Sequence, residues 1–68
     1  MTLKEFRENS GLRQVDVADK LDVDQAAVSH WESGKTRPSR KYHARIAKLY
    51  GCTVDELLRT DELKKEES

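Results

Sequence analysis

The stretch that decides the fold is Gln14–Trp31, which reads QVDVADKLDVDQAAVSHW. In its first half, small and apolar residues recur at the spacing of one helix face, at Val17, Ala18 and Leu21. In its second half, Val28 and Trp31 are spaced like the inward-facing side chains of a helix. The sequence therefore predicts two short helices, the first over residues 14–21, which are joined by a tight turn.

The turn between these helices contains two aspartates. Asp22 stands where the chain must bend sharply, and aspartate is one of the few residue types besides glycine that tolerate the left-handed region. Asp24 is expected to cap the second helix, because its carboxylate can accept from free backbone N–H groups and its charge suits the positive end of the helix dipole. The side of this helix predicted to face solvent carries Gln25, Ala26, Ser29 and His30.

This arrangement resembles the Cro/repressor-type (XRE-like) helix-turn-helix family of bacterial and phage transcription regulators. The resemblance runs from about Leu3 to Leu58 and includes the segments GLRQ, HWESGK and RPS. Two positions depart from it, since the family prefers Gly where Asp22 stands and Ser or Thr where Arg13 stands. The resemblance implies an all-α fold, a compact five-helix lambda-repressor-like DNA-binding domain whose second and third helices form the helix-turn-helix.

The outer helices are predicted from their start and stop signals. The segments TLKE at residues 2–5 and TVDE at residues 53–56 have the spacing of capping boxes. Ser39 is expected to cap a helix over residues 40–50, in which His43 is a packed or half-buried imidazole. The inward stripe of that helix is predicted to hold Ala44, Ile46, Ala47 and Tyr50.

Charge is distributed unevenly along the chain. Thirteen Lys and Arg residues balance thirteen Asp and Glu residues, so the net charge is zero, which by itself disfavours a nucleic-acid binder. Residues 33–54, however, contain no acid and six basic residues, which are Lys35, Arg37, Arg40, Lys41, Arg45 and Lys48. A polarised molecule of this kind attracts a polyanion on one side, although a basic segment can also be only a solvated face.

The exposed side of the second helix is the predicted base-reading site. A helix-turn-helix inserts the first half of its second helix into the major groove of DNA. The amide of Gln25 matches the N7 and N6 edge of adenine, the methyl of Ala26 suits a thymine methyl, and Ser29 is permissive. His30 can donate to guanine N7 or to a phosphate. The alternative is that this segment is only an ordinary exposed first turn.

Phosphate contacts are expected on either side of the second helix. In the family that the chain resembles, a glutamine in the place of Gln14 binds a phosphate, and Arg13 is expected to add a contact beside it. The loop and helix start that follow are expected to grip the other strand through Lys35, Thr36, Arg37, Arg40 and Lys41. Contacts of this kind position the domain and carry no sequence code.

Arg7 falls on the apolar side of the first helix, which is unusual for a charged residue. The resemblance implies that Arg7 pairs with Glu32, at the end of the base-reading helix. The alternative is an arginine whose stem packs against the core while its guanidinium reaches solvent.

Length and composition limit the class of protein. Sixty-eight residues make one small domain, expected over residues 1–59, with a charged C-terminal tail over residues 60–68 that is a frayed helical extension or disordered. No apolar run reaches the roughly 20 residues that span a bilayer, and no signal-peptide core follows Met1, so a cytoplasmic location is expected. The lone Cys52 is expected to be a small buried hydrophobe.

The sequence therefore predicts sequence-specific binding of double-stranded DNA through the major groove, by a transcriptional regulator of the repressor or Cro type. Two copies are expected on a two-fold operator, as a weak homodimer assembled on the DNA. No phosphate-binding loop, nucleophile motif or metal-ligand spacing is present, so no enzyme activity, catalytic residue, metal, cofactor or small-molecule ligand is expected. The alternative is a protein-interaction module on the same fold, such as an antitoxin or an adaptor.

Overall fold

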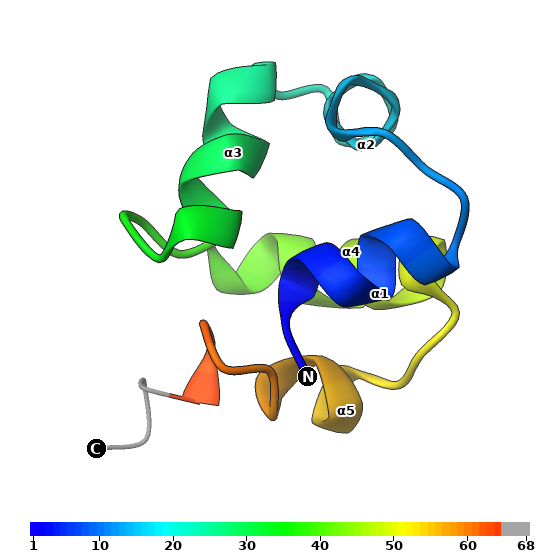
Figure 1. The fold of residues 1–68 in the computed structure, drawn as a ribbon, viewed down its shortest axis with the longest axis vertical. Coiled ribbons are helices and arrows are strands. Elements are labelled where there is room, and N and C mark those ends of the chain that lie inside the picture. Colours follow the sequence, from blue (N-terminus) through cyan, green and yellow to red (C-terminus); the bar gives the residue numbers. More distant parts are fainter. Residues whose placement is uncertain (65–68) are drawn as a thin grey trace.

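The structure is a computed structural model that describes residues 1–64, and the described part contains helices joined by turns and loops, with no strand (Figure 1). Its helices, in chain order, are α1 (Leu3–Asn9), α2 (Gln14–Leu21), α3 (Gln25–Ser33), α4 (Arg40–Tyr50) and α5 (Val54–Leu58). α2 and α3 pack against each other, α4 lies behind α1 in this view and contacts α1, α2 and α5, and α5 lies near the N-terminus. The all-α, five-helix fold predicted from the sequence is confirmed.

Both predicted capping boxes are present, at the starts of α1 and α5. The Thr2 hydroxyl accepts from the Glu5 N–H at 3.1 Å, and the Glu5 carboxylate accepts from the Thr2 N–H at 2.8 Å. Thr53 and Glu56 repeat the two bonds at 3.1 and 2.9 Å. Each pair satisfies two backbone N–H groups that a helix start otherwise leaves without a partner.

The other two predicted caps are wrong in one respect. Asp24 and Ser39 occupy the N-cap positions of α3 and α4, but neither side chain makes a capping hydrogen bond. The reason lies in the first turn of each helix. The Ala27 N–H donates to the Asp24 carbonyl, and the Tyr42 N–H donates to the Ser39 carbonyl, each at 2.9 Å. In both helices the backbone carbonyl of the N-cap residue therefore accepts from the same N–H group that a capping side chain would use.

The core is a single cluster to which every helix contributes. Its buried hydrophobic residues are Leu3, Val17, Ala18, Leu21, Val28, Trp31, Ile46, Ala47, Tyr50, Leu57 and Leu63. The predicted stripe of α4 is wrong at Ala44, which is exposed, whereas His43 is buried with Nε2 3.3 Å from the Pro38 carbonyl oxygen. The reason is helix geometry, because position 43 falls in register with the buried positions 46, 47 and 50.

The frayed or disordered extension expected from residue 60 is wrong for residues 60–64. Thr60 and Leu63 are each only 1% exposed. The Asp61 N–H donates to the Met1 carbonyl at 3.0 Å, and the Glu62 carboxylate accepts from the Leu3 N–H at 2.8 Å. This segment therefore completes the core and satisfies the start of α1. The rest of the predicted tail, residues 65–68, lies outside the described residues.

A buried ion pair joins α1 to α3. Arg7 Nε lies 2.6 Å from Glu32 Oε2, Arg7 Nη2 lies 3.2 Å from Oε1, and the two side chains are only 11% and 6% exposed. A third guanidinium bond runs from Nη1 to the Leu12 carbonyl at 2.9 Å. The hydrogen bond with Glu32 raises the pKa of Arg7, so the guanidinium stays charged. The guanidinium does not reach solvent, and Arg7 fixes both α3 and the connection to α2.

The turn between α2 and α3 is strained at one residue. Asp22 ends α2 in the left-handed region, with φ 58° and ψ 47°, and the following Val23 N–H donates to the Ala18 carbonyl at 3.0 Å. The same pattern of bonds ends α3 at Gly34 and α4 at Gly51. Asp22 is the only non-glycine residue with positive φ in the described part of the chain. The turn that positions α3 therefore carries a steric cost that the other two helix ends avoid.

We predict that Arg7→Ala lowers the free energy of unfolding by about 3 kcal/mol, because it leaves the Glu32 carboxylate buried without its partner. Urea unfolding followed by circular dichroism measures this change. Lys4→Ala, which removes an exposed cation from the same helix, is the control. A loss no larger than that of the control would contradict a stabilising role for the pair.

We predict that Asp22→Gly raises the free energy of unfolding by about 0.5 kcal/mol, because glycine adopts the left-handed conformation without a Cβ clash. Asp24→Gly removes the same charge two residues away, where φ is −71°, and should give no such gain. Thermal unfolding of the two variants compares them directly. An equal gain in both would assign the effect to the carboxylates and not to the backbone.

Candidate nucleic-acid interface

The outer surface of α3 presents a row of small polar side chains, here called the reading ridge and made of Gln25, Ala26, Ser29 and His30. The first three are exposed and His30 is partly buried. The opposite side of the helix is anchored in the core, since Val28 is 0% and Trp31 6% exposed. These anchors determine which side of α3 remains open to a ligand, because they fix its rotation about its own axis.

Trp31 also fixes α3 relative to α4. Its ring centroid lies 5.9 Å from that of Tyr42, and the two rings are inclined by 43°. Lys41 Nζ lies 5.2 Å from the centroid of the Tyr42 ring, close enough for a cation–π contact. The aromatic pair thus connects the core side of α3 to the basic first turn of α4.

A basic loop follows α3 directly. α3 ends at Gly34, which has φ 80°, and exposed residues run from there to the buried Pro38. The residues predicted to bind phosphate on this side are all exposed, and they are Lys35, Thr36, Arg37, Arg40 and Lys41. Within residues 1–64, the four cations among them form no ion pair. Their charges are therefore available to an anion.

The two predicted phosphate ligands at the start of α2 are already engaged. Gln14 is partly buried, and its side-chain amide donates to Glu32 Oε1 at 3.0 Å. Arg13 is exposed, and its Nε and Nη2 each lie 3.1 Å from a carboxylate oxygen of Asp16. Hydrogen bonding with Arg13 lowers the pKa of Asp16. The Arg13 side chain does not cap α2; the Asp16 carboxylate instead accepts from the Arg13 N–H at 2.9 Å.

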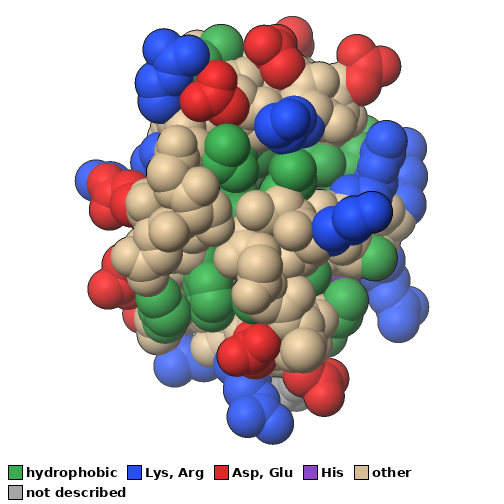
Figure 2. All heavy atoms as spheres, turned by 90° about the vertical axis from the view of Figure 1, so that its right-hand side faces the viewer, with side chains coloured by type: hydrophobic (Ala, Val, Ile, Leu, Met, Phe, Trp, Pro, Cys, Tyr) green, Lys and Arg blue, Asp and Glu red, His purple; other side chains and the backbone are tan. Residues whose placement is uncertain are grey.

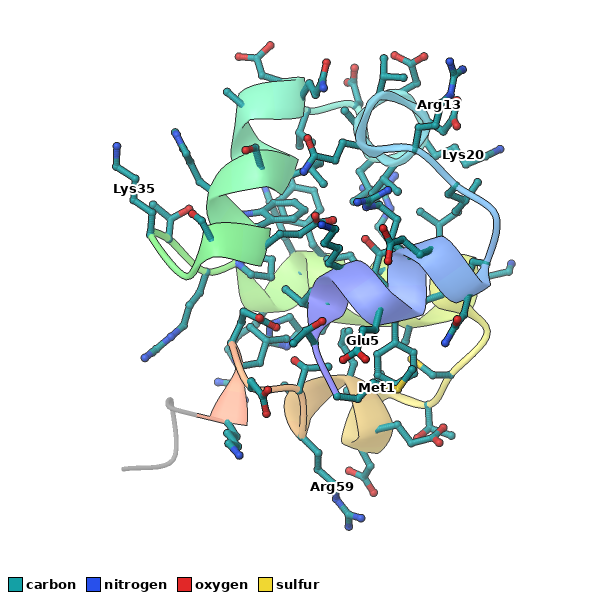
Figure 3. The ribbon with its side chains drawn as sticks, viewed as in Figure 1. Met1, Glu5, Arg13, Lys20, Lys35 and Arg59 are labelled. Atoms are coloured by element: carbon teal, nitrogen blue, oxygen red, sulfur yellow. The ribbon has the colours of Figure 1, made fainter. Side chains whose placement is uncertain are left out.

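The basic segment does not lie on one face, contrary to the single cationic side expected from the sequence. Arg45 and Lys48, from the later turns of α4, border a groove together with Lys20 of α2. Figure 2 views the side turned away from α3 and shows hydrophobic side chains between those of Lys and Arg. Figure 3 places Lys20 and Lys35 on opposite sides of the molecule. Because successive residues of a helix point in different directions, the basic residues of one continuous segment are divided between two surfaces.

Other kinds of site find little support in the described residues. Among residues 1–64, no three or more His, Cys, Asp or Glu side chains are grouped to hold a metal ion. In the same range, no helix combines the length and apolarity that crossing a bilayer requires. Cys52 is partly buried, and desolvation raises the pKa of its thiol, which disfavours the reactive thiolate.

Comparisons with known proteins agree with this geometry. Residues 3–57 match the family model described as Helix-turn-helix. The chain is 39% identical over 61 residues to the HTH-type transcriptional activator BcrR of Enterococcus faecalis, which covers 90% of this chain and 30% of the relative. It is 32% identical over 63 residues to the HTH-type transcriptional regulator ImmR of Bacillus subtilis, which covers 93% of this chain and 50% of the relative.

A shorter relative matches over most of its length. An uncharacterised HTH-type transcriptional regulator of Methanocaldococcus jannaschii is 36% identical over 55 residues, which covers 81% of this chain and 83% of the relative. No solved structure matches the chain. The chain thus spans half or less of BcrR and ImmR but most of the archaeal relative. Because the family model matches well over half of its residues, the chain belongs to the helix-turn-helix family.

Proposed function

We propose that this chain is the DNA-binding domain of a transcription regulator and that it inserts α3 into the major groove of double-stranded DNA. The observation that carries this proposal is the reading ridge, held open to solvent by the buried Val28 and Trp31 and followed directly by a basic loop. An α-helix of this shape fits the major groove, where every base pair presents a distinct pattern of hydrogen-bonding groups. We expect this activity in the cytoplasm.

Sequence preference would come from a few side chains. Gln25 stands in the first turn of α3 and can offer a donor and an acceptor together to adenine. Ala26 offers only a methyl to a thymine methyl, and Ser29 and His30 lie one turn further along the same face. Each good bidentate contact is worth about 1–3 kcal/mol of discrimination. Four side chains specify a short half-site, which supports binding as two copies on a two-fold operator.

Affinity would come mainly from phosphate contacts beside the ridge. The cations of the loop and of the first turn of α4, which are exposed, would neutralise phosphates of the bound DNA. Gln14 stands at the N-terminus of α2, where free backbone N–H groups can also bind a phosphate. Arg13 would contact DNA only by exchanging its bond to Asp16 for one to phosphate. We therefore expect Arg13 to contribute less than the loop.

A dimer on DNA would use only a small contact. Leu57 and Leu63 are buried in the core of the same chain, so neither is available to a second copy. Val54 is 38% exposed and Leu58 is partly buried beside it. This surface is too small for an obligate dimer, and it supports a weak homodimer that forms when two half-sites hold the copies together.

A protein-interaction module on the same fold, such as an antitoxin or an adaptor, is the competing function. The two functions differ in their dependence on salt. Binding to a duplex should weaken linearly in log K against log salt, with a slope proportional to the number of phosphates neutralised. An anisotropy titration at several salt concentrations measures that slope. Binding to a duplex that ignores both salt and sequence would favour the interaction module.

We predict that Gln25→Ala removes the preference at one base pair, by about 1–3 kcal/mol, while affinity for random duplexes stays the same. The reason is that Gln25 is proposed to contact a base edge and no phosphate. Selection from a random duplex pool, followed by anisotropy with single-base variants, measures the preference. A uniform loss of affinity over all sequences would show that Gln25 does not read a base.

We predict the opposite pattern for Arg40→Ala, because Arg40 is proposed to contact phosphate. Affinity should fall for every duplex tested, and the slope of log K against log salt should become shallower by about one. The ranking of duplexes should be the same as for the unmodified chain. A changed base preference with an unchanged salt slope would remove Arg40 from the phosphate contacts.

A further inference from the structure

A groove on the side turned away from α3 combines an apolar floor with a basic rim (Figure 2). We call it the leucine groove, and its volume is about 500 Å³. The floor is formed by Leu12, Leu21 and Leu49, and the rim by Lys20, Arg45 and Lys48. These residues come from α2, α4 and the connection between α1 and α2.

The floor of the leucine groove is held rigidly. Leu21 is only 2% exposed, whereas Leu12 and Leu49 pack against the core and remain partly exposed. Two hydrogen bonds hold the backbone of Leu12 to Arg7. The Leu12 N–H donates to the Arg7 carbonyl at 3.3 Å, and the Leu12 carbonyl accepts from Arg7 Nη1 at 2.9 Å. An apolar surface that is already ordered loses little conformational entropy when it binds a ligand.

The rim gives the groove a definite charge preference. Lys20, Arg45 and Lys48 are all exposed, and none of them forms an ion pair within residues 1–64. No carboxylate lines the groove. Three cations gathered around a low-dielectric floor repel one another, and an anionic group placed among them relieves that repulsion. The complementary ligand is therefore apolar along its length and acidic at several points.

Three other occupants fit the groove less well. Lys20 of the groove and Lys35, just after α3, lie on opposite sides of the molecule (Figure 3), so DNA bound by α3 would face away from the groove. A second copy packed groove to groove would double the number of facing cations without adding a carboxylate. The cations stand on two different helices, so one small carboxylate reaches only part of the rim. An amphipathic helix supplies acids and apolar side chains together, at intervals of three and four residues.

We propose that the leucine groove docks an acidic, leucine-bearing helical segment of a partner protein. Its apolar side chains contact Leu12 and Leu49, and its carboxylates pair with Lys20, Arg45 and Lys48. The partner binds while α3 is on DNA, because the two surfaces do not overlap. The site then connects the DNA-bound domain to another protein by a contact that does not involve the reading ridge.

The test uses the full chain and a fluorescein-labelled helical peptide with leucines at every third or fourth position among glutamates. Two matched peptides carry lysine in place of the glutamates or alanine in place of the leucines. Anisotropy should show binding of the acidic leucine peptide and clearly weaker binding of both matched peptides. Absence of binding, or equal binding of the lysine peptide, would overturn the proposal.

Charge reversal locates the site on the protein. The double variant Arg45→Glu/Lys48→Glu should weaken binding of the acidic peptide about tenfold, because two attractive contacts become repulsive. The control is Lys4→Glu/Arg59→Glu, which changes the net charge equally at exposed positions outside the groove. The control should leave peptide affinity unchanged. Equal losses in both variants would mean non-specific attraction and would overturn the proposal.

A second variant, and peptide binding measured in the presence of DNA, complete the test. Leu49→Ala, with its folding checked by circular dichroism, should weaken the acidic peptide without affecting duplex binding. Peptide affinity should be the same with and without a saturating duplex selected from a random pool, and displacement by the duplex would overturn the placement of the site. The peptide assay needs no DNA. A failure of the proposed DNA binding can therefore be told apart from a failure of peptide binding at the leucine groove.

Discussion

The arrangement of the whole domain depends on one buried ion pair, between Arg7 and Glu32. Arg7 donates to Glu32 in the last turn of α3 and, through Nη1, to the Leu12 carbonyl, while Gln14 of α2 donates to the same carboxylate. These bonds connect three helices and one connecting segment at a single point. A chain of this length buries only a modest apolar core, so the orientation of its helices relies heavily on such a contact. Loss of either charge would leave the other buried and unpaired.

The Arg7–Glu32 pair holds in place residues of both proposed surfaces. Glu32 fixes the end of the helix that carries the reading ridge, and Arg7 fixes Leu12 in the floor of the leucine groove. The basic residues are divided as well, with Lys35 in the loop directly after α3 and Arg45 at the groove. A domain with zero net charge can therefore present two cationic surfaces. One is polar and is proposed for DNA, and the other is apolar at its centre and is proposed for an acidic protein segment.

Local signals in the sequence were sufficient for the helices and the turn. Capping boxes, the glycines that end helices, and the spacing of Val28 and Trp31 all act within a few residues, so the fold and the exposed side of α3 follow from them. The absence of capping hydrogen bonds from the Asp24 and Ser39 side chains was not predictable, because a backbone carbonyl competes for the same amide. His43 took the place of Ala44 in the core because a one-residue change rotates a helical stripe by about 100°. Leu63 and the leucine groove depend on residues distant in sequence, whose meeting no local pattern encodes.

If α3 is the surface that meets DNA, the backbone amides of the chain should report it residue by residue. Titration of the ¹⁵N-labelled protein with a duplex selected from a random pool, followed by two-dimensional NMR, measures the change at each amide. We predict large shift changes over residues 25–30 and in the loop over residues 35–37, and small ones over residues 45–49. Changes confined to residues 45–49, with residues 25–30 unaffected, would contradict the proposed role of α3.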